Sequence, residues 1–114
     1  MNTVFSYMYR DASNYKEFEE VVFAGTLTAE EKEALKNLIE DNGDGFIPHQ
    51  IGLENLQHSM VSFPSEDDHI WHEFDSVEDT DREPTDRRTI QEFINSLVSV
   101  EWDEMDACEL LGLP

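Results

Sequence analysis

The stretch TVFSYMYRDASNYKEFEEVVFAG, residues 3–25, decides the fold, because it predicts two neighbouring β-strands joined by a tight turn. Residues 3–11 and 16–25 are both rich in β-branched and aromatic side chains, which favour strands. Turn-forming residues lie between them, and Asn14 is the residue that we expect in a left-handed conformation. The stretch therefore predicts a β-hairpin.

The segment after the hairpin has the features of a helix. Thr28 and Glu31 have the spacing of a capping box, in which each side chain accepts a hydrogen bond from the backbone of the other residue. An apolar stripe at helical spacing follows, so we expect a helix over 29–41. Gly43 or Gly45 supplies the left-handed residue that ends it.

Two more helices are expected towards the C-terminus. Pro84 and Thr85 begin the first, with Thr85 as its N-cap. Its apolar face comprises Ile90, Phe93, Ile94 and Leu97. A shorter helix is predicted over 103–111, with an acidic first turn that suits the helix dipole and with Gly112 as its end.

The central part of the chain has weaker periodicity. Residues 46–64 are predicted to be mostly irregular, with a short helical turn near 54–58. Residues 69–77 are predicted to form a strand, and 78–83 are too acidic to bury and are predicted to be a loop. The chain thus forms a single α+β domain, residues 1–114, in which helices pack on one face of a small, mainly antiparallel sheet.

Net charge is the most unusual property of the sequence. It has 27 Asp and Glu against seven Lys and Arg, a net charge of −20 at pH 7 with a pI of about 4.1. Phosphate binding needs cationic side chains, so direct binding to nucleic acid or to an anionic membrane is not expected. The expected partner is a basic protein, because opposite charges steer association.

The chain lacks the sequence signals of exported, membrane-spanning and enzymatic proteins. Cys108 is the single cysteine, and no basic N-terminal region precedes an apolar run, which together favour a cytoplasmic protein. No apolar run approaches the roughly 18 residues of a membrane span. Without a nucleophile motif or a glycine-rich phosphate loop, the sequence predicts a non-enzymatic protein with no cofactor.

The segment EDNGDGFIPHQI, residues 40–51, partly matches a calcium-binding loop. Such a loop needs Asp at its first position and a bidentate Glu at its twelfth, and these positions hold Glu40 and Ile51. A helix end followed by a glycine-rich turn accounts for the same residues. We therefore interpret the segment as a turn.

A second group of metal-ligand residue types lies in DDHIWHE, residues 67–73. His69, His72 and Glu73 are of the types that bind zinc, so a small metal-binding protein is one alternative. In a strand, however, His69 and His72 would point to opposite faces. The spacing therefore favours a strand with Ile70 and Phe74 inside.

The acidic residues are concentrated in one stretch. Residues 66–83 contain nine of them, opposed only by Arg82. In an extended chain, residues on the same face lie about 6.6 Å apart, roughly two phosphate steps along a DNA strand. A row of odd-numbered carboxylates, with Trp71 as an apolar anchor, would imitate a phosphate ladder. The predicted partner-binding residues are Trp71, Glu73, Asp75, Glu78, Asp79, Asp81 and Glu83.

Three segments carry a resemblance to other proteins: YMYRDASNYK (7–16), FIPHQIGL (46–53) and DDHIWHE (67–73). They resemble a set of small acidic proteins of bacteria and mobile elements that has no assigned activity. The resemblance implies that this chain comes from a bacterium or a mobile element. In size and charge the chain is also similar to the nucleic-acid mimics that phages and plasmids use against restriction and CRISPR systems.

These observations support one preferred hypothesis and two alternatives. The preferred one is a non-enzymatic inhibitor that occupies the basic, nucleic-acid-binding surface of a partner. The alternatives are an immunity protein or antitoxin against a basic toxin or nuclease, and the metal-binding protein. A charged surface that serves only solubility would show the same composition. Trp102, Met105 and Leu111 fit core packing and a dimer interface equally well, so the oligomeric state is open.

Overall fold

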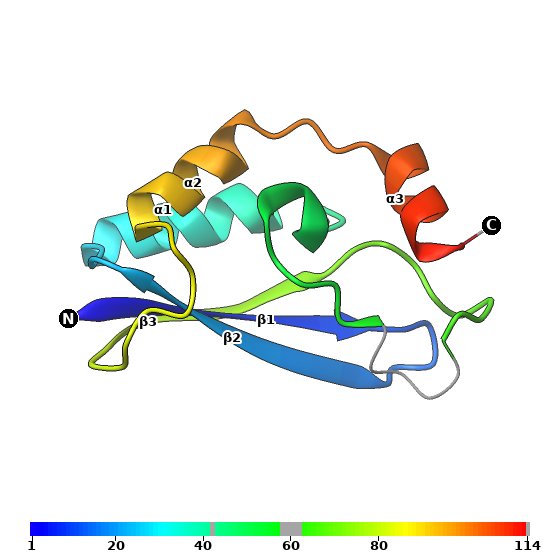
Figure 1. The fold of residues 1–114 in the computed structure, drawn as a ribbon, viewed down its shortest axis with the longest axis horizontal. Helices are drawn as coiled ribbons and strands as arrows, with labels where there is room; N and C mark the ends of the chain where they lie inside the picture. Colours follow the sequence, from blue (N-terminus) through cyan, green and yellow to red (C-terminus); the bar gives the residue numbers. More distant parts are fainter. Residues whose placement is uncertain (42, 58–62, 114) are drawn as a thin grey trace.

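A computed structural model shows an antiparallel sheet with helices on one face (Figure 1). The structure describes residues 1–41, 43–57 and 63–113. Within these ranges the sheet has three strands in the order β2-β1-β3: β1 is Asn2–Arg10, β2 is Lys16–Ala24 and β3 is Glu73–Thr80. Both pairings are antiparallel, so the predicted α+β class is confirmed.

The predicted hairpin is formed by β1 and β2, which pair along their whole length. Asn14 has a φ of 68°, as expected for the left-handed residue of the turn. The carboxylate of Asp11 accepts hydrogen bonds from the backbone amides of Ser13 at 3.0 Å and Tyr15 at 2.9 Å. A local side chain therefore fixes the turn, which explains why short-range patterns predict it.

Helix α1, Ala29–Glu40, also forms where the sequence places it. Both hydrogen bonds of the capping box between Thr28 and Glu31 are present, at 2.9 and 3.1 Å. Gly43 follows the helix with a φ of 81°, and its amide donates to the carbonyl of Glu40. Capping at both ends thus agrees with the prediction.

Helix α2, Ile90–Ser99, begins later than predicted, and Thr85 is not its N-cap. The N-cap is Thr89, which forms a capping box with Glu92. Thr85 instead pairs with the outer edge of β2: its amide donates to the carbonyl of Val22 at 2.8 Å, and its hydroxyl accepts from the Val22 amide at 2.9 Å. The local pattern predicts Thr85 as a helix N-cap, but in the fold this residue makes a long-range contact with β2.

The remaining helical elements are short. The 3₁₀ helix η1 spans Pro48–Ile51, whereas the helical turn predicted near 54–58 lies partly outside the described residues. Helix α3, Glu104–Leu111, follows Asp103 as its N-cap and ends at Gly112, which has a φ of 70°. The C-terminal helix is therefore confirmed at both ends.

Strand β3 is shifted from the predicted range, so the prediction of a strand over 69–77 and of a loop from residue 78 is wrong at both ends. Before the strand, the ring Nε2 of His69 donates to the carbonyl of Arg10 at 2.6 Å. Ile70 is buried in a small apolar cluster below α3. The His69 side chain thus ties this segment to the end of β1, and backbone pairing with β1 starts only at Glu73.

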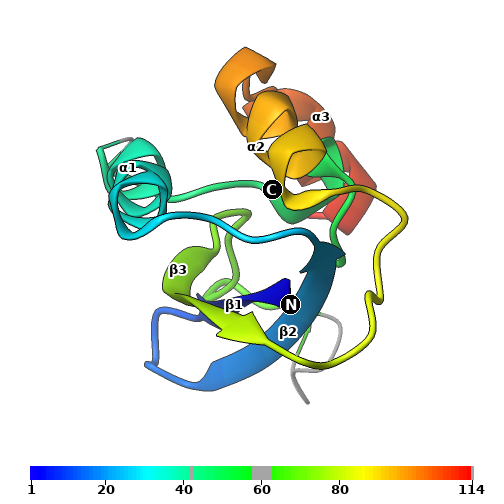
Figure 2. The same cartoon turned by 90° about the vertical axis from the view of Figure 1, so that its left-hand side faces the viewer.

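The main core lies between the sheet and the helices α1 and α2 (Figure 2). Phe23 stacks on Phe93 with ring centroids 4.5 Å apart, and Phe5 meets Phe93 edge-on at 5.1 Å. At the C-terminus, Leu111 is buried, whereas Met105 is 78% exposed. Among the described residues, no helix is long and apolar enough to cross a membrane.

Candidate partner-binding surface

The acidic residues of β3 do not form the predicted row, because the strand contains a β-bulge. Its pairing with β1 moves from Ser76 directly to Phe74, so Asp75 is the extra residue. Odd-numbered side chains before Asp75 therefore point to the opposite face of the sheet from odd-numbered side chains after it. Glu73 lies on the face without helices, and Asp79 lies on the face that α1 covers. The prediction of one continuous ladder of odd-numbered carboxylates is wrong for this reason.

Two of the predicted carboxylates are matched by cations of the protein itself. Glu73 Oε2 lies 3.1 Å from Arg10 Nε. Asp79 Oδ1 lies 2.9 Å from Lys32 Nζ on α1, which ties the helix to the strand. Both are partly exposed pairs of modest strength, yet they reduce the charge available to a partner.

Four other predicted carboxylates are exposed and, among the described residues, take part in no ion pair. We call these residues the acidic edge: Asp75, Glu78, Asp81 and Glu83. Arg82, the one base in this stretch, forms an ion pair with Glu20 of β2 at 2.9 Å. Within the described residues, no cation of the protein itself is therefore paired with the acidic edge.

Trp71 precedes β3 and does not continue the row of β3 side chains. Its ring is half-buried and meets Trp102 edge-on, with centroids 6.2 Å apart. It also lines a cleft of about 480 Å³, together with Glu40, Asp44 and Glu73. The predicted aromatic anchor thus lies in an acidic cleft at the start of β3.

The cluster predicted as a metal site anchors the chain to the end of β1. Asp68 Oδ1 accepts from the hydroxyl of Tyr9 at 2.5 Å. His69 donates from Nε2 to the Arg10 carbonyl, and its Nδ1 accepts from the Trp71 amide at 3.1 Å, so both ring nitrogens are used. In the described parts of the chain, no group of three or more His, Cys, Asp or Glu side chains could hold a metal ion. The metal-binding alternative therefore has no support from the geometry.

His72, the second metal candidate, is fully buried among Tyr7, Tyr9 and Phe46. Its Nε2 accepts a hydrogen bond from the Leu56 amide at 2.9 Å. Burial lowers the pKa of His72 to about 3, because desolvation disfavours the charged ring. His72 is therefore a neutral core residue that joins the central loop to the sheet.

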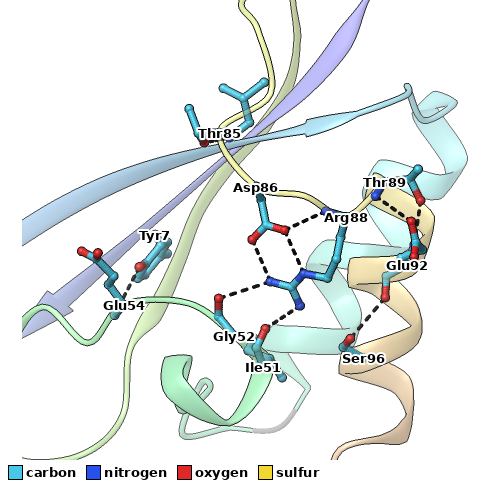
Figure 3. A network of polar contacts seen from close by, with 11 residues as sticks. Tyr7, Ile51, Gly52, Glu54, Thr85, Asp86, Arg88, Thr89, Glu92 and Ser96 are labelled. Atoms are coloured by element: carbon cyan, nitrogen blue, oxygen red, sulfur yellow. Dashed lines mark hydrogen bonds and ion pairs between the residues drawn. The ribbon is translucent and has the colours of Figure 1, made fainter.

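Arg88 is the centre of a polar network that the sequence did not reveal (Figure 3). Its Nε and one terminal nitrogen donate to the two carboxylate oxygens of Asp86 at 3.0 and 2.9 Å. The other terminal nitrogen, Nη1, donates to the Ile51 carbonyl at 2.6 Å, and Nη2, which bonds to Asp86, makes a longer bond of 3.3 Å to the Gly52 carbonyl. The bonded guanidinium lowers the pKa of the Asp86 carboxyl. This network joins the end of η1 to the start of α2.

The same guanidinium packs on aromatic rings of the core. The Arg88 side chain lies 5.6 Å from the ring centroid of Phe23 and 5.3 Å from that of Phe93, within cation–π distance. Arg87, its neighbour in the sequence, is exposed. No local pattern distinguishes these two arginines, since the difference comes only from the fold.

Comparison of the chain with protein-family models, with curated proteins and with solved structures gives no match. The functional argument therefore depends on the surface itself.

Proposed function

We propose that this chain is a non-enzymatic binding protein whose acidic edge covers a basic, nucleic-acid-binding surface of a partner protein. The observation that carries the proposal is the exposed, unmatched charge of Asp75, Glu78, Asp81 and Glu83. The carboxylate of Asp86, which follows them in the chain, is instead matched by Arg88. Unmatched surface charge attracts an opposite surface and accelerates association with it.

The proposed action is competition. A surface that binds nucleic acid is rich in Lys and Arg, because each phosphate contact releases counterions and adds affinity. A chain with a net charge of −20 is itself repelled by nucleic acid and attracted to such a surface. Since the bulge interrupts the carboxylate row, the proposal depends on charge density and not on a regular phosphate-like spacing.

The test is capture of partners from the host lysate with three tagged forms of the chain. The edge variant is D75N/E78Q/D81N/E83Q. The control is E30Q/E101Q/E104Q/E109Q, which removes the same charge from exposed positions on or next to α1 and α3. We expect the wild type and the control to recover a basic protein that salt releases, and the edge variant to lose it. Nucleic-acid binding by that partner should fall when the chain is added.

The identity of the captured protein separates the two related functions. A nuclease or effector of a restriction or CRISPR system would make the chain a counter-defence inhibitor. A toxin encoded beside this chain would make it an antitoxin or immunity protein. A partner that the edge variant retains, or that salt does not release, would contradict the proposal in both forms.

A further inference from the structure

We infer that the free edge of β3 takes up an extended segment of the partner as an added strand, and that this segment alternates apolar and basic residues. The inference rests on the proposed function, because it describes how the acidic edge would hold a basic partner. It is carried by three observations: the open edge, the cleft beside it and the different character of its two faces.

Strand β3 has β1 on one side only, and within the described ranges no strand pairs with its other edge. Just before the strand, His72 exchanges two backbone hydrogen bonds with Phe46, at 3.0 and 2.8 Å. The backbone amide and the backbone carbonyl of His72 both point to Phe46. This bridge therefore lies at the edge of the strand that β1 does not occupy. The fold thus already forms one backbone bridge at this edge, and within the described residues no strand pairs with the edge from Phe74 onwards. Added strands gain affinity from such main-chain groups.

A cleft runs between this edge and α1. It has a volume of about 520 Å³ and is lined by the strand residues 74–77 and by both basic and acidic side chains of α1: Lys32, Glu33, Lys36 and Glu40. Phe74 and Val77 are only half-buried, so each has apolar surface left to cover. Side chains of an added strand that lie over Phe74 and Val77 should be apolar, since burial of the exposed part of these side chains is favourable.

The face without helices has the opposite character. Glu73 and Glu78 lie on it, and Glu78 has no partner in an ion pair among the described residues. Basic side chains of an added strand would meet these carboxylates. A second copy of this chain would instead bring carboxylates against carboxylates, and charged residues at sheet edges are known to prevent such pairing. Charge complementarity therefore selects a basic segment and excludes self-association.

The test uses a defined probe, a short peptide of alternating lysine and valine, with isotope-labelled protein. Alternate amides of β3 face the open edge and should exchange rapidly in the free protein. On saturation with peptide, exchange at these amides should slow by about tenfold or more. The amides that already pair with β1 should change little.

Two matched peptides separate strand addition from simple charge attraction. One has all lysines in one block and all valines in the other, and one keeps the alternation but carries a methyl group on every backbone nitrogen. We expect both to bind about tenfold more weakly than the parent peptide, because the first loses the facial match and the second loses its donors.

The outcomes distinguish the two proposals. Equal binding of all three peptides, no binding of the parent peptide, or binding without slower exchange in β3 would overturn the added strand and leave the basic-partner function standing. If poly-L-lysine binds the edge variant D75N/E78Q/D81N/E83Q as tightly as the wild type, the proposed function is overturned as well.

Discussion

The two edges of the sheet are completed in different ways. The β2 edge is crossed by the chain itself: Thr85 pairs with Val22, and three residues later Arg88 bonds to Asp86 and Ile51. The β3 edge has no such cover within the described residues, and its carboxylates project into solvent. A crossing held by a matched ion pair thus closes the end of the β2 edge, and unmatched carboxylates lie along the β3 edge. We expect the closed edge to govern stability and the open edge to govern binding.

The largest expected effect comes from breaking the closed edge. Arg88→Ala should lower the free energy of unfolding by about 3 kcal/mol, because it leaves the partly buried Asp86 carboxylate and two carbonyls without their donor. Arg87→Ala is the matched control and should change stability by no more than ~0.5 kcal/mol. Urea unfolding of both variants measures the difference. Equal stability of the Arg88→Ala and Arg87→Ala variants would show that the Arg88 network does not hold the segment that crosses the β2 edge.

A second prediction concerns the core residue beside the open edge. The folded pKa of His72 is about 3, against an ordinary value of 6.5, so the unfolded chain takes up a proton between these values that the folded chain does not. Stability from this group is complete above pH 6.5 and is lost as the pH falls towards 3.

Urea unfolding at pH 7 and pH 5 tests this. From pH 7 to pH 5, the free energy of unfolding should fall by about 2 kcal/mol more in the wild type than in His72→Asn, because only the wild type carries the buried imidazole. His72→Asn is expected to be less stable at pH 7, so the readout is the change with pH. The same loss in both proteins would rule out His72 as its source.

A smaller effect is expected at the anchor that places the start of β3. Tyr9→Phe removes a hydroxyl that donates to Asp68 and accepts from the His69 amide at 3.2 Å. The loss should be about 1 kcal/mol in thermal or urea unfolding. Tyr15→Phe, at an exposed side chain, is the control and should leave stability unchanged. A similar result for both would mean that other contacts fix this segment.

The smallest effect on stability is expected at the acidic edge. The variant D75N/E78Q/D81N/E83Q should match the wild type, or exceed it by less than about 1 kcal/mol at low salt, because it removes only mutual repulsion. The difference should disappear at high salt, where exposed charges are screened. A clear loss of stability in thermal unfolding would contradict the expectation that the β3 edge governs binding and not stability.

The sequence predicts the parts of this fold that neighbouring residues determine. Asn14 in the hairpin turn and Thr28 at the start of α1 act through bonds to residues within a few positions, so their patterns are sufficient. Thr89 and Glu92 have the same capping spacing as Thr28 and Glu31, and that signal was available for α2. Pro84 and Thr85 offer an earlier start for the same helix, and only the long-range contact of Thr85 with Val22 excludes it.

The candidate surface was only partly predictable. Composition identifies the acidic stretch, but the bulge at Asp75 depends on how β3 meets β1, and no local pattern shows it. The matching of Asp79 by Lys32 likewise depends on where α1 packs. The position of Trp71 depends on its contact with Trp102, far along the chain, which no local pattern shows.

The bulge at Asp75 also bears on how this sequence can change by descent. Loss of this one residue would leave Ser76 opposite Ser6 and Phe74 opposite Tyr7 in a regular ladder, so the Phe74 ring and the Glu73 carboxylate would stay on their present faces. Gain or loss of a residue elsewhere in β3 would instead turn part of the strand over. Variation in the length of this strand is therefore expected at Asp75.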